Sequence, residues 1–238
     1  MKTPPLVTPG PALTVDEVRR YSRHLIIPDV AMAGQQRLMN AKVLCVGAGG
    51  LGSPALMYLA AAGVGTIGIV EFDTVDESNL QRQIAHQQSA IGVEKVTSAA
   101  TSCQQLNPDV VIRSYPLRAT ADWLNNNLTG VSLVVDCSDN AAVRYAINSQ
   151  CLAHAIPWVS GAAIGLSGQI AVFDPRDDLS PCYGCLYPNL DDQQLSCAEA
   201  GVLSPLVGVI GSMQALEALR LLSPFGQAQS GWLASYNA

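Results

Sequence analysis

A glycine-rich segment between an apolar run and a helical pattern has the spacing of a binding site. It reads GAGGLG from Gly47 to Gly52. In such a segment Gly47 permits a tight turn, Gly49 lets a phosphate approach the backbone, and Gly52 allows close packing of helix and strand. Glu71 follows roughly 20 residues later, where a carboxylate can accept hydrogen bonds from ribose hydroxyls. The segment therefore predicts a nucleotide site that suits NAD, FAD or ATP; a tight turn without a ligand is the alternative.

Positive charge gathers just beyond Glu71. The polar stretch from Asp73 to His86 carries Asn79 and Arg82, and Lys95 begins the next helical pattern. Arg82 and Lys95 can both reach a triphosphate, the first with a planar fork and the second as a point charge. Displacement of pyrophosphate from ATP needs such charge, because negative charge spreads over the α-phosphate and the leaving group, whereas hydride transfer does not. The charges favour ATP chemistry over an NAD-dependent dehydrogenase; ordinary solvated side chains are the alternative.

A carboxylate is expected at the edge of the predicted sheet. The segment DCSDN, from Asp136 to Asn140, ends the fourth apolar run and places Asp139 at the carboxyl edge of a parallel sheet. Ligands of open α/β sheets bind at this edge, and a carboxylate there is well placed to hold Mg²⁺. An N-cap for the helix that begins at Asn140 is the alternative role of Asp139.

Alternating apolar runs and helical patterns must position these side chains. We expect strands at 42–46, 66–70, 110–115, 133–137 and around 158–159. We expect helices at 53–62, 95–106, 120–127 and 140–154. Parallel neighbours need a crossover connection, so this order predicts a Rossmann-like, doubly wound, mainly parallel α/β sheet.

The alternation changes in the last third of the chain. A strand at 168–174 has no helix before it, and a long loop from Ser180 to Ser204 follows. A last helix at 205–222 leads to a short segment at 231–236. We expect these segments to form an added C-terminal antiparallel part of the sheet, and the long loop to be functional.

The composition limits the class of protein. The chain has 13 basic and 19 acidic side chains, and a formal charge of −6 excludes a nonspecific nucleic-acid or membrane binder. Hydrophobic residues make up 49% and charged residues 13%, which allows a sizeable core. No apolar stretch suits a membrane span or a secretory signal, so a cytoplasmic protein is expected. Residues 1–13 are rich in proline and are expected to form a flexible leader to a single domain, 14–238.

Seven cysteines, an odd number without an export signal, indicate reduced thiols. Only Cys182 and Cys185 are spaced as a pair, which matches the first half of a tetrahedral zinc site. Cys197 lies in the long loop, close to the predicted start of the last helix at Pro205, where the helix N-terminus can lower a thiol pKa. A buried, unreactive thiol is the alternative for Cys197.

Several segments, in the same order from about Val15 to the end, resemble one enzyme family. Besides GAGGLG they are RYSRHL at 20–25, SNLQRQ at 78–83, DCSDN at 136–140, SGAAIGLSGQIAVF at 160–173, CYGC at 182–185 and CAEAGVLSPLVGVIGSMQALEALRLL at 197–222. They resemble the ThiF/MoeB/HesA family of ubiquitin-activating-enzyme-like adenylyltransferases. At 160–170 and 197–222 the molybdopterin-synthase branch (MoeB) is more similar than the thiamine-pathway branch (ThiF), which is the alternative.

The resemblance implies an enzyme that joins the C-terminal Gly-Gly carboxylate of a small ubiquitin-like sulfur carrier to AMP and releases pyrophosphate, in molybdenum cofactor biosynthesis. It implies Mg²⁺ at Asp139 and a homodimer in which Arg23 reaches across from the second subunit. It also implies nucleotide contacts from Gly47, Gly49, Gly50, Gly52, Glu71, Asn79, Arg82 and Lys95. Because a carboxylate is an adequate nucleophile, such a site needs charge neutralisation and positioning, here by Arg23, Arg82, Lys95 and Asp139, rather than a general base.

The chain departs from the family pattern in two places. Glu71 stands where members usually carry Asp. Members complete the zinc site of Cys182 and Cys185 with a second CxxC near the C-terminus, whereas this chain ends at Ala238. We therefore expect a truncated sequence, or a half site that cannot hold zinc tightly. In some branches of the family, the cysteine at the position of Cys197 forms a covalent sulfur link with the carrier. A non-catalytic scaffold that binds the carrier and an NAD-dependent dehydrogenase are the rival functions.

Overall fold

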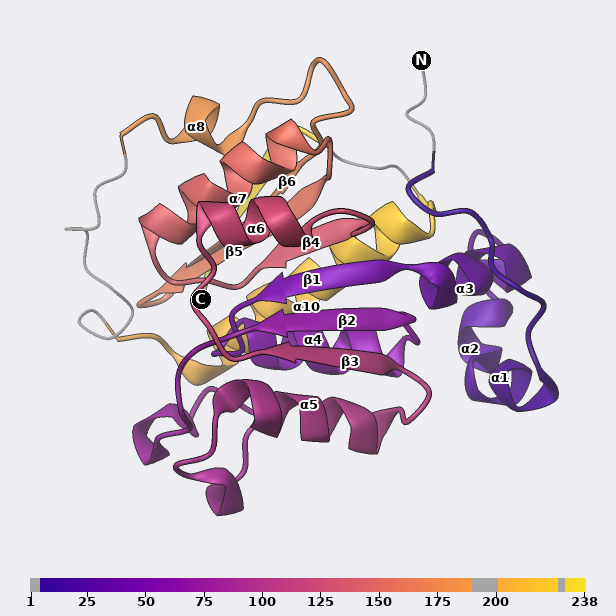
Figure 1. Ribbon diagram of the computed structural model, residues 1–238, viewed down its shortest axis with the longest axis horizontal. Coiled ribbons are helices and arrows are strands. Elements are labelled where there is room, and N and C mark those ends of the chain that lie inside the picture. The colour runs from indigo at the N-terminus through magenta and orange to yellow at the C-terminus, as the bar shows by residue number, and fades with distance from the viewer. Residues whose placement is uncertain (1–4, 190–200, 227–229) are drawn as a thin grey trace.

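A single sheet organises the chain. The computed structural model describes residues 5–189, 201–226 and 230–238, and within them seven strands lie in the order β3-β2-β1-β4-β5-β6-β7 (Figure 1). The strands are β1 (Lys42–Val46), β2 (Thr66–Val70), β3 (Val111–Tyr115), β4 (Leu133–Asp136), β5 (Trp158–Ile164), β6 (Ser167–Phe173) and β7 (Trp232–Asn237). β1 to β5 are parallel, whereas β6 and β7 run antiparallel to their neighbours. The predicted Rossmann-like sheet with an antiparallel C-terminal part is confirmed.

Helices cover both faces of this sheet. Their bounds are α1 (Val15–Arg20), α2 (Ser22–Leu25), α3 (Ala31–Asn40), α4 (Gly52–Ala61), α5 (Lys95–Leu106), α6 (Ala121–Asn127), α7 (Ala141–Ala153), α8 (Tyr183–Leu186) and α10 (Ser204–Leu222). Two short 3₁₀ helices, η1 (Glu77–Asn79) and η2 (Gln88–Ala90), lie between β2 and α5. The predicted helices agree with α4, α5, α6, α7 and α10 to within one residue at either end.

Alternate strand residues face two separate cores, as expected for strands covered on both sides. Val43 and Ile67 pack with residues of α4, α5 and α10. Leu44 and Val46, which point to the opposite face, pack with residues of α6 and α7. This arrangement explains why the strand sequences are continuously apolar rather than alternating.

The N-terminal helices α1, α2 and α3 lie at the amino ends of the parallel strands (Figure 1). The sequence patterns did not predict them. Part of the predicted flexible leader is attached here: Val7 is buried, Asn40 Nδ2 donates to the Thr8 carbonyl at 3.2 Å, and Gln36 Nε2 donates to the Pro11 carbonyl at 2.9 Å. A third hydrogen bond runs from the Gly10 N–H to the Gln36 carbonyl at 3.3 Å. Residues 5–11 are therefore held against α3, although this proline-rich segment has no regular structure.

Helix α10 is the one helix of the described residues that is long and apolar enough to cross a membrane. It packs instead against α4 and across β5 and β6. Leu206, Ile210 and Ala218 are each at most 2% exposed, so its apolar character is explained by burial in the core.

Candidate active site

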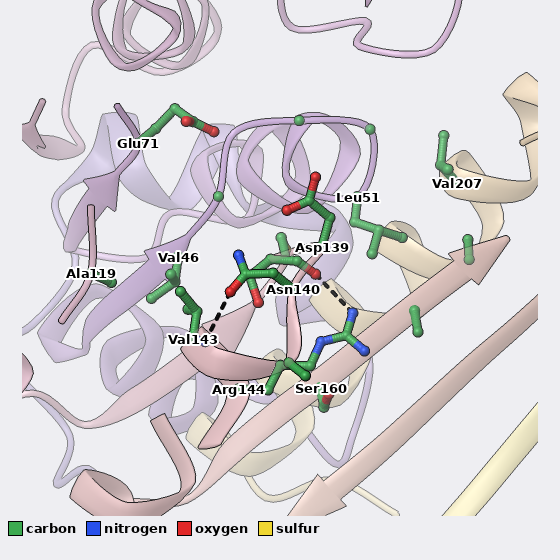
Figure 2. A pocket seen from close by; sticks show the side chains of 18 of the residues that line it. Val46, Leu51, Glu71, Ala119, Asp139, Asn140, Val143, Arg144, Ser160 and Val207 are labelled. Atoms are coloured by element: carbon green, nitrogen blue, oxygen red, sulfur yellow. Dashed lines mark hydrogen bonds between the residues drawn. The ribbon is translucent and has the colours of Figure 1, made fainter. Parts of the chain in front are cut away.

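A cavity of about 730 Å³ opens at the carboxyl ends of β1, β2 and β4. One part of its wall is the glycine turn with the segments that follow β2 and β4, and the other is formed by β5 and β6 (Figure 2). The predicted site residues that line it are Gly47, Gly49, Gly50, Glu71, Arg82, Lys95 and Asp139. The fold thus brings together side chains that lie far apart in the sequence.

The glycines of the turn differ in what a side chain at each position would meet. A Cβ at Gly47 or Gly52 would collide with backbone, at 2.7 Å from the Cys137 carbonyl oxygen and 2.1 Å from the Gly47 carbonyl oxygen respectively. Gly47 also has a φ of 99°, which L side chains rarely adopt. Among the residues that the structure describes, a Cβ at Gly49 would meet only Gln83 Nε2, at 3.6 Å. Gly47 and Gly52 are therefore needed to make the turn, whereas Gly49 leaves open space inside the cavity that a phosphate group can fill.

Glu71 joins the glycine turn to the end of β2. Its Oε2 accepts a hydrogen bond from the Ala48 N–H at 3.0 Å, and its Oε1 accepts from the N–H groups of Phe72 and Asp73 at 2.8 and 3.0 Å. A carboxylate can accept about four hydrogen bonds, so capacity for one ligand hydroxyl remains. The longer side chain of Glu, compared with Asp, is what reaches back to the turn.

In the described part of the chain, four cationic side chains line the cavity, and two of them, Arg82 and Lys95, are predicted site residues. Lys95 begins α5, is 7% exposed at its side chain, and places Nζ 3.2 Å from Asp73 Oδ2. Arg82 is half-buried and donates from Nη1 to the Ser78 carbonyl at 3.2 Å. That contact uses one of the five N–H groups of a guanidinium, so the fork retains donors for an anion.

Asp139 is exposed and lines the same cavity. The role of N-cap for α7 belongs to Asn140, whose Oδ1 accepts a hydrogen bond from the Val143 N–H at 3.0 Å (Figure 2). The alternative prediction for Asp139, that it caps this helix, is therefore wrong. A hard carboxylate oxygen beside a triphosphate-sized space fits Mg²⁺, which binds through one or two carboxylates together with substrate phosphates.

Comparison with known proteins identifies the family of the chain. The ThiF family model matches residues 21–238. The chain belongs to the ThiF family. It is 44% identical to the molybdopterin-synthase adenylyltransferase of Salmonella typhimurium over 226 residues, which are 95% of this chain and 90% of that protein. It is 42% identical to the adenylyltransferase and sulfurtransferase MOCS3 of Mus musculus over 230 residues, 96% of this chain and 50% of that protein.

Solved structures share the fold at low sequence identity. PaaA superposes with a TM-score of 0.78 at 19% identity, and the superposed region covers 95% of this chain and 75% of the PaaA chain. Escherichia coli MccB, solved with ATP, superposes with a TM-score of 0.76 at 18% identity and covers 92% of this chain and 71% of its own.

Three predicted positions lie apart from the cavity. Gly52 is behind the turn, and Asn79 does not line the cavity; its Nδ2 donates to Ser78 Oγ at 3.3 Å. Arg23 is exposed on α2, at the opposite end of the sheet from this ThiF-family cavity (Figure 1). Within one chain Arg23 is therefore not part of the site.

The cysteines do not form a closed metal site within the described residues. Cys182 and Cys185 face each other with their sulfurs 3.4 Å apart, but the described parts of the chain contain no group of three or more His, Cys, Asp or Glu side chains that could hold a metal. Structural zinc needs four ligands, so these two do not fit zinc alone. Cys197 lies outside the described residues. Burial opposes ionisation of Cys182, but hydrogen bonds from Cys185 and neighbouring groups outweigh it and lower the Cys182 pKa.

Two further residues lie beside the turn, and the predictions from sequence did not single them out. Gln83 is 5% exposed, lines the cavity, and has a buried Oε1 with no hydrogen-bond partner in the described part of the chain. His86 is buried between Ala48 O, 2.9 Å from Nε2, and Ser98 Oγ, 2.9 Å from Nδ1. Because a carbonyl only accepts, Nε2 carries the proton, and burial lowers the pKa of His86. Gln83 could have been found from its place in the SNLQRQ segment, whereas nothing in the sequence signals His86.

Proposed function

We propose that this protein is an ATP-dependent adenylyltransferase of the cytoplasm. It activates the C-terminal Gly-Gly carboxylate of a small ubiquitin-like sulfur carrier, of the molybdopterin-synthase small-subunit type, as an acyl-adenylate with release of pyrophosphate. The observation that carries the proposal is that Arg82, Lys95 and Asp139 line the same cavity as the glycine turn at Gly49. The names of the closely similar relatives, molybdopterin-synthase adenylyltransferases among them, support it.

In this proposal the chain's own residues bind and orient ATP. The open backbone at Gly49 takes phosphate, and Glu71 accepts a hydrogen bond from a ribose hydroxyl. Gln83 Oε1, which is buried and has no partner among the described residues, accepts a hydrogen bond from the bound nucleotide. Asp139 would hold Mg²⁺, which neutralises phosphate charge. Asn79 lies in the same polar segment as Gln83, and its side chain reaches the phosphates only if it turns away from Ser78.

Catalysis then depends on charge rather than on proton transfer. The attacking carboxylate is already ionised at neutral pH, so no general base is required. Arg82 and Lys95 stabilise the negative charge that grows on the α-phosphate and the departing pyrophosphate. Because fixed cations stabilise the charge, the proposed reaction needs no histidine to take up a proton. The buried, neutral His86 therefore supports the turn and takes no proton from the substrate.

The second part of the cavity suits a peptide tail of small residues. Ser160, Ala162 and Ala163 of β5 line it, and their short side chains leave room for an extended backbone. A Gly-Gly tail entering along β5 would bring its carboxylate toward Asp139 and the glycine turn.

A second subunit completes the proposed site. Arg23 is exposed at the far end of the sheet, so it can act only on the site of a partner copy. We therefore include a homodimer in the proposal, with Arg23 contacting ATP across the interface. Zinc is not part of the proposed chemistry, because Cys182 and Cys185 find no further ligands among the residues that the structure describes.

Carrier-dependent exchange of radiolabelled pyrophosphate into ATP tests the proposal. Exchange is expected with a molybdopterin-type carrier that has an intact Gly-Gly end and not with the same carrier lacking it. A thiamine-pathway carrier is the comparison, and stronger exchange with it would assign the protein to the other branch. Protection from thermal unfolding by NAD and not by ATP, with no exchange, would reject adenylation altogether.

Replacement of Gly49 by alanine is expected to weaken ATP binding about tenfold, or roughly 1.4 kcal/mol. The added methyl group enters space that is open in the protein but that the phosphate needs, and its nearest neighbour is 3.6 Å away. The melting temperature should therefore stay within about 2 °C of the wild-type value. Calorimetric titration with ATP and a thermal melt measure the two effects. Unchanged ATP affinity would show that the nucleotide does not approach Gly49.

A further inference from the structure

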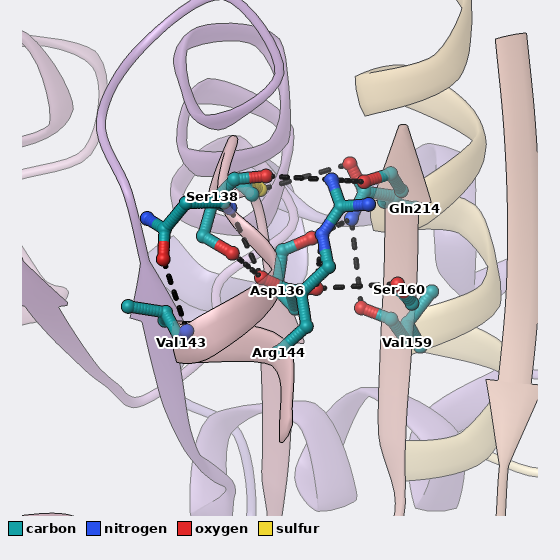
Figure 3. A network of polar contacts seen from close by, with 10 residues as sticks. Asp136, Ser138, Val143, Arg144, Val159, Ser160 and Gln214 are labelled. Carbon is teal, nitrogen blue, oxygen red and sulfur yellow. Dashed lines mark hydrogen bonds and ion pairs between the residues drawn. The ribbon is translucent and has the colours of Figure 1, made fainter. Parts of the chain in front are cut away.

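A buried polar network lies beneath the turn that carries Asp139. Asp136, at the end of β4, is fully buried, and its Oδ1 accepts hydrogen bonds from Ser138 N at 3.0 Å and Ser138 Oγ at 2.6 Å. Its Oδ2 accepts from Ser160 Oγ at 3.2 Å and lies 3.6 Å from Arg144 Nε (Figure 3). Burial raises the pKa of Asp136, and Arg144 and the serine groups offset part of this effect.

Arg144 connects the network to the next strand. Its Nη2 donates to the Ser138 carbonyl at 2.8 Å and to the Gly161 carbonyl at 3.1 Å (Figure 3). The amide, hydroxyl and carbonyl of Ser138 are therefore all engaged. On the other side of Asp139, Asn140 is fixed as the N-cap of α7. Asp139 is thus an exposed carboxylate whose two neighbours are both held in place.

We infer that Asp136 and Arg144 are positioning residues that aim the Asp139 carboxylate at the metal that accompanies the nucleotide. The inference rests on the proposed function for the identity of that ligand. An exposed aspartate on a free loop would lose conformational entropy on binding a metal, whereas one on a prearranged turn loses less. Groups that orient a metal ligand typically account for 10- to 100-fold in metal affinity.

The variant Asp136→Asn tests this inference. The amide keeps the shape of the carboxylate, but it removes the counter-charge of Arg144 and places an N–H₂ group where an acceptor was. Without that charge Arg144 is held less firmly against the Ser138 carbonyl. The quantity to measure is the affinity for α,β-methylene-ATP with saturating Mn²⁺ divided by the affinity with EDTA. We expect this ratio to fall about tenfold.

A matched control separates positioning from general stability. Asp174 and Arg176 form a second buried pair, with Arg176 Nε donating to Asp174 Oδ1 at 2.8 Å, and neither residue lines the cavity. The acidic side chains of the two pairs are 0% and 5% exposed and the basic ones 16% and 20%. Asp174→Asn should lower the melting temperature and leave the metal-dependent ratio unchanged. If Asp136→Asn does not fold, Ser138→Ala removes a single hydrogen bond of the network and should lower the ratio by a smaller factor.

The outcomes are distinct. The inference is overturned if folded Asp136→Asn keeps a ratio within twofold of the wild-type value. If Asp136→Asn does not fold, the same result in folded Ser138→Ala overturns it. An equal fall of the ratio in Asp174→Asn overturns it as well. The binding measurement needs no catalysis, so it holds even if the wild-type protein shows no carrier-dependent exchange. Absence of exchange with a normal metal-dependent ratio would reject the proposed adenylation and leave the positioning role in place.

Discussion

Arg82→Ala is expected to lower carrier-dependent pyrophosphate exchange about a thousandfold while the protein stays folded. Removal of a donor that meets charge developing in the transition state costs roughly 10²–10³ in rate, and an arginine on a transferring phosphoryl group 10³ or more. Within the described residues the side chain makes a single hydrogen bond, with the Ser78 carbonyl at 3.2 Å, so its loss should change stability by less than about 0.5 kcal/mol. Exchange rates at saturating ATP and a thermal melt measure both quantities.

Two further variants identify the reason for the loss. Arg82→Lys restores a positive charge without the planar fork, so it should recover only part of the activity. Arg113→Ala removes an exposed arginine of β3 that does not line the cavity, and its exchange rate should equal the wild-type rate. Exchange that persists in Arg82→Ala would mean that charge stabilisation by this residue is not how the site works.

The sheet and the glycine turn could be predicted because local sequence determines them. Apolar runs such as 42–46 and 66–70 are buried on both faces, and only a glycine fits the backbone next to Cys137 at position 47. Helices α1, α2 and α3 were missed because they carry few buried residues: α1 and α2 bury none of their side chains and α3 buries only three. A short helix with little apolar surface gives no periodic signal.

The site was only partly predictable, because partners in three dimensions decide the roles of its polar residues. Asp139 and Asn140 are adjacent and both are good N-caps, and only the structure assigns the cap to Asn140. Asp136 reads as the last residue of an apolar strand, yet its charge is balanced by Arg144 from α7. The sequence contains these residues, but only their positions in three dimensions distinguish Asp139, the proposed metal ligand, from the residues that hold its turn in place.

The cysteines of the core, in contrast, could be interpreted from the sequence pattern alone. Four cysteines, Cys45, Cys103, Cys137 and Cys151, are buried and free, as their positions in predicted strands and helices indicated. Burial raises the pKa of the Cys103 thiol to about 12, so it stays protonated at neutral pH. Here the local pattern suffices, because burial in a regular element decides the chemistry.

Gly52→Ala is expected to destabilise the fold by at least about 2 kcal/mol and to lower the melting temperature by roughly 4–8 °C. A Cβ at this position would lie 2.1 Å from the Gly47 carbonyl oxygen, which is backbone and cannot move aside without opening the turn. Gly208→Ala is the control: it lies in α10, and in the described part of the chain no atom outside its own helix backbone lies within 4 Å of the added Cβ, so alanine should stabilise the helix by about 0.5–1 kcal/mol. Chemical denaturation of both variants measures the difference. Equal stability of Gly52→Ala and the wild type would show that the turn relaxes easily, and the packing role given to Gly52 would then be wrong.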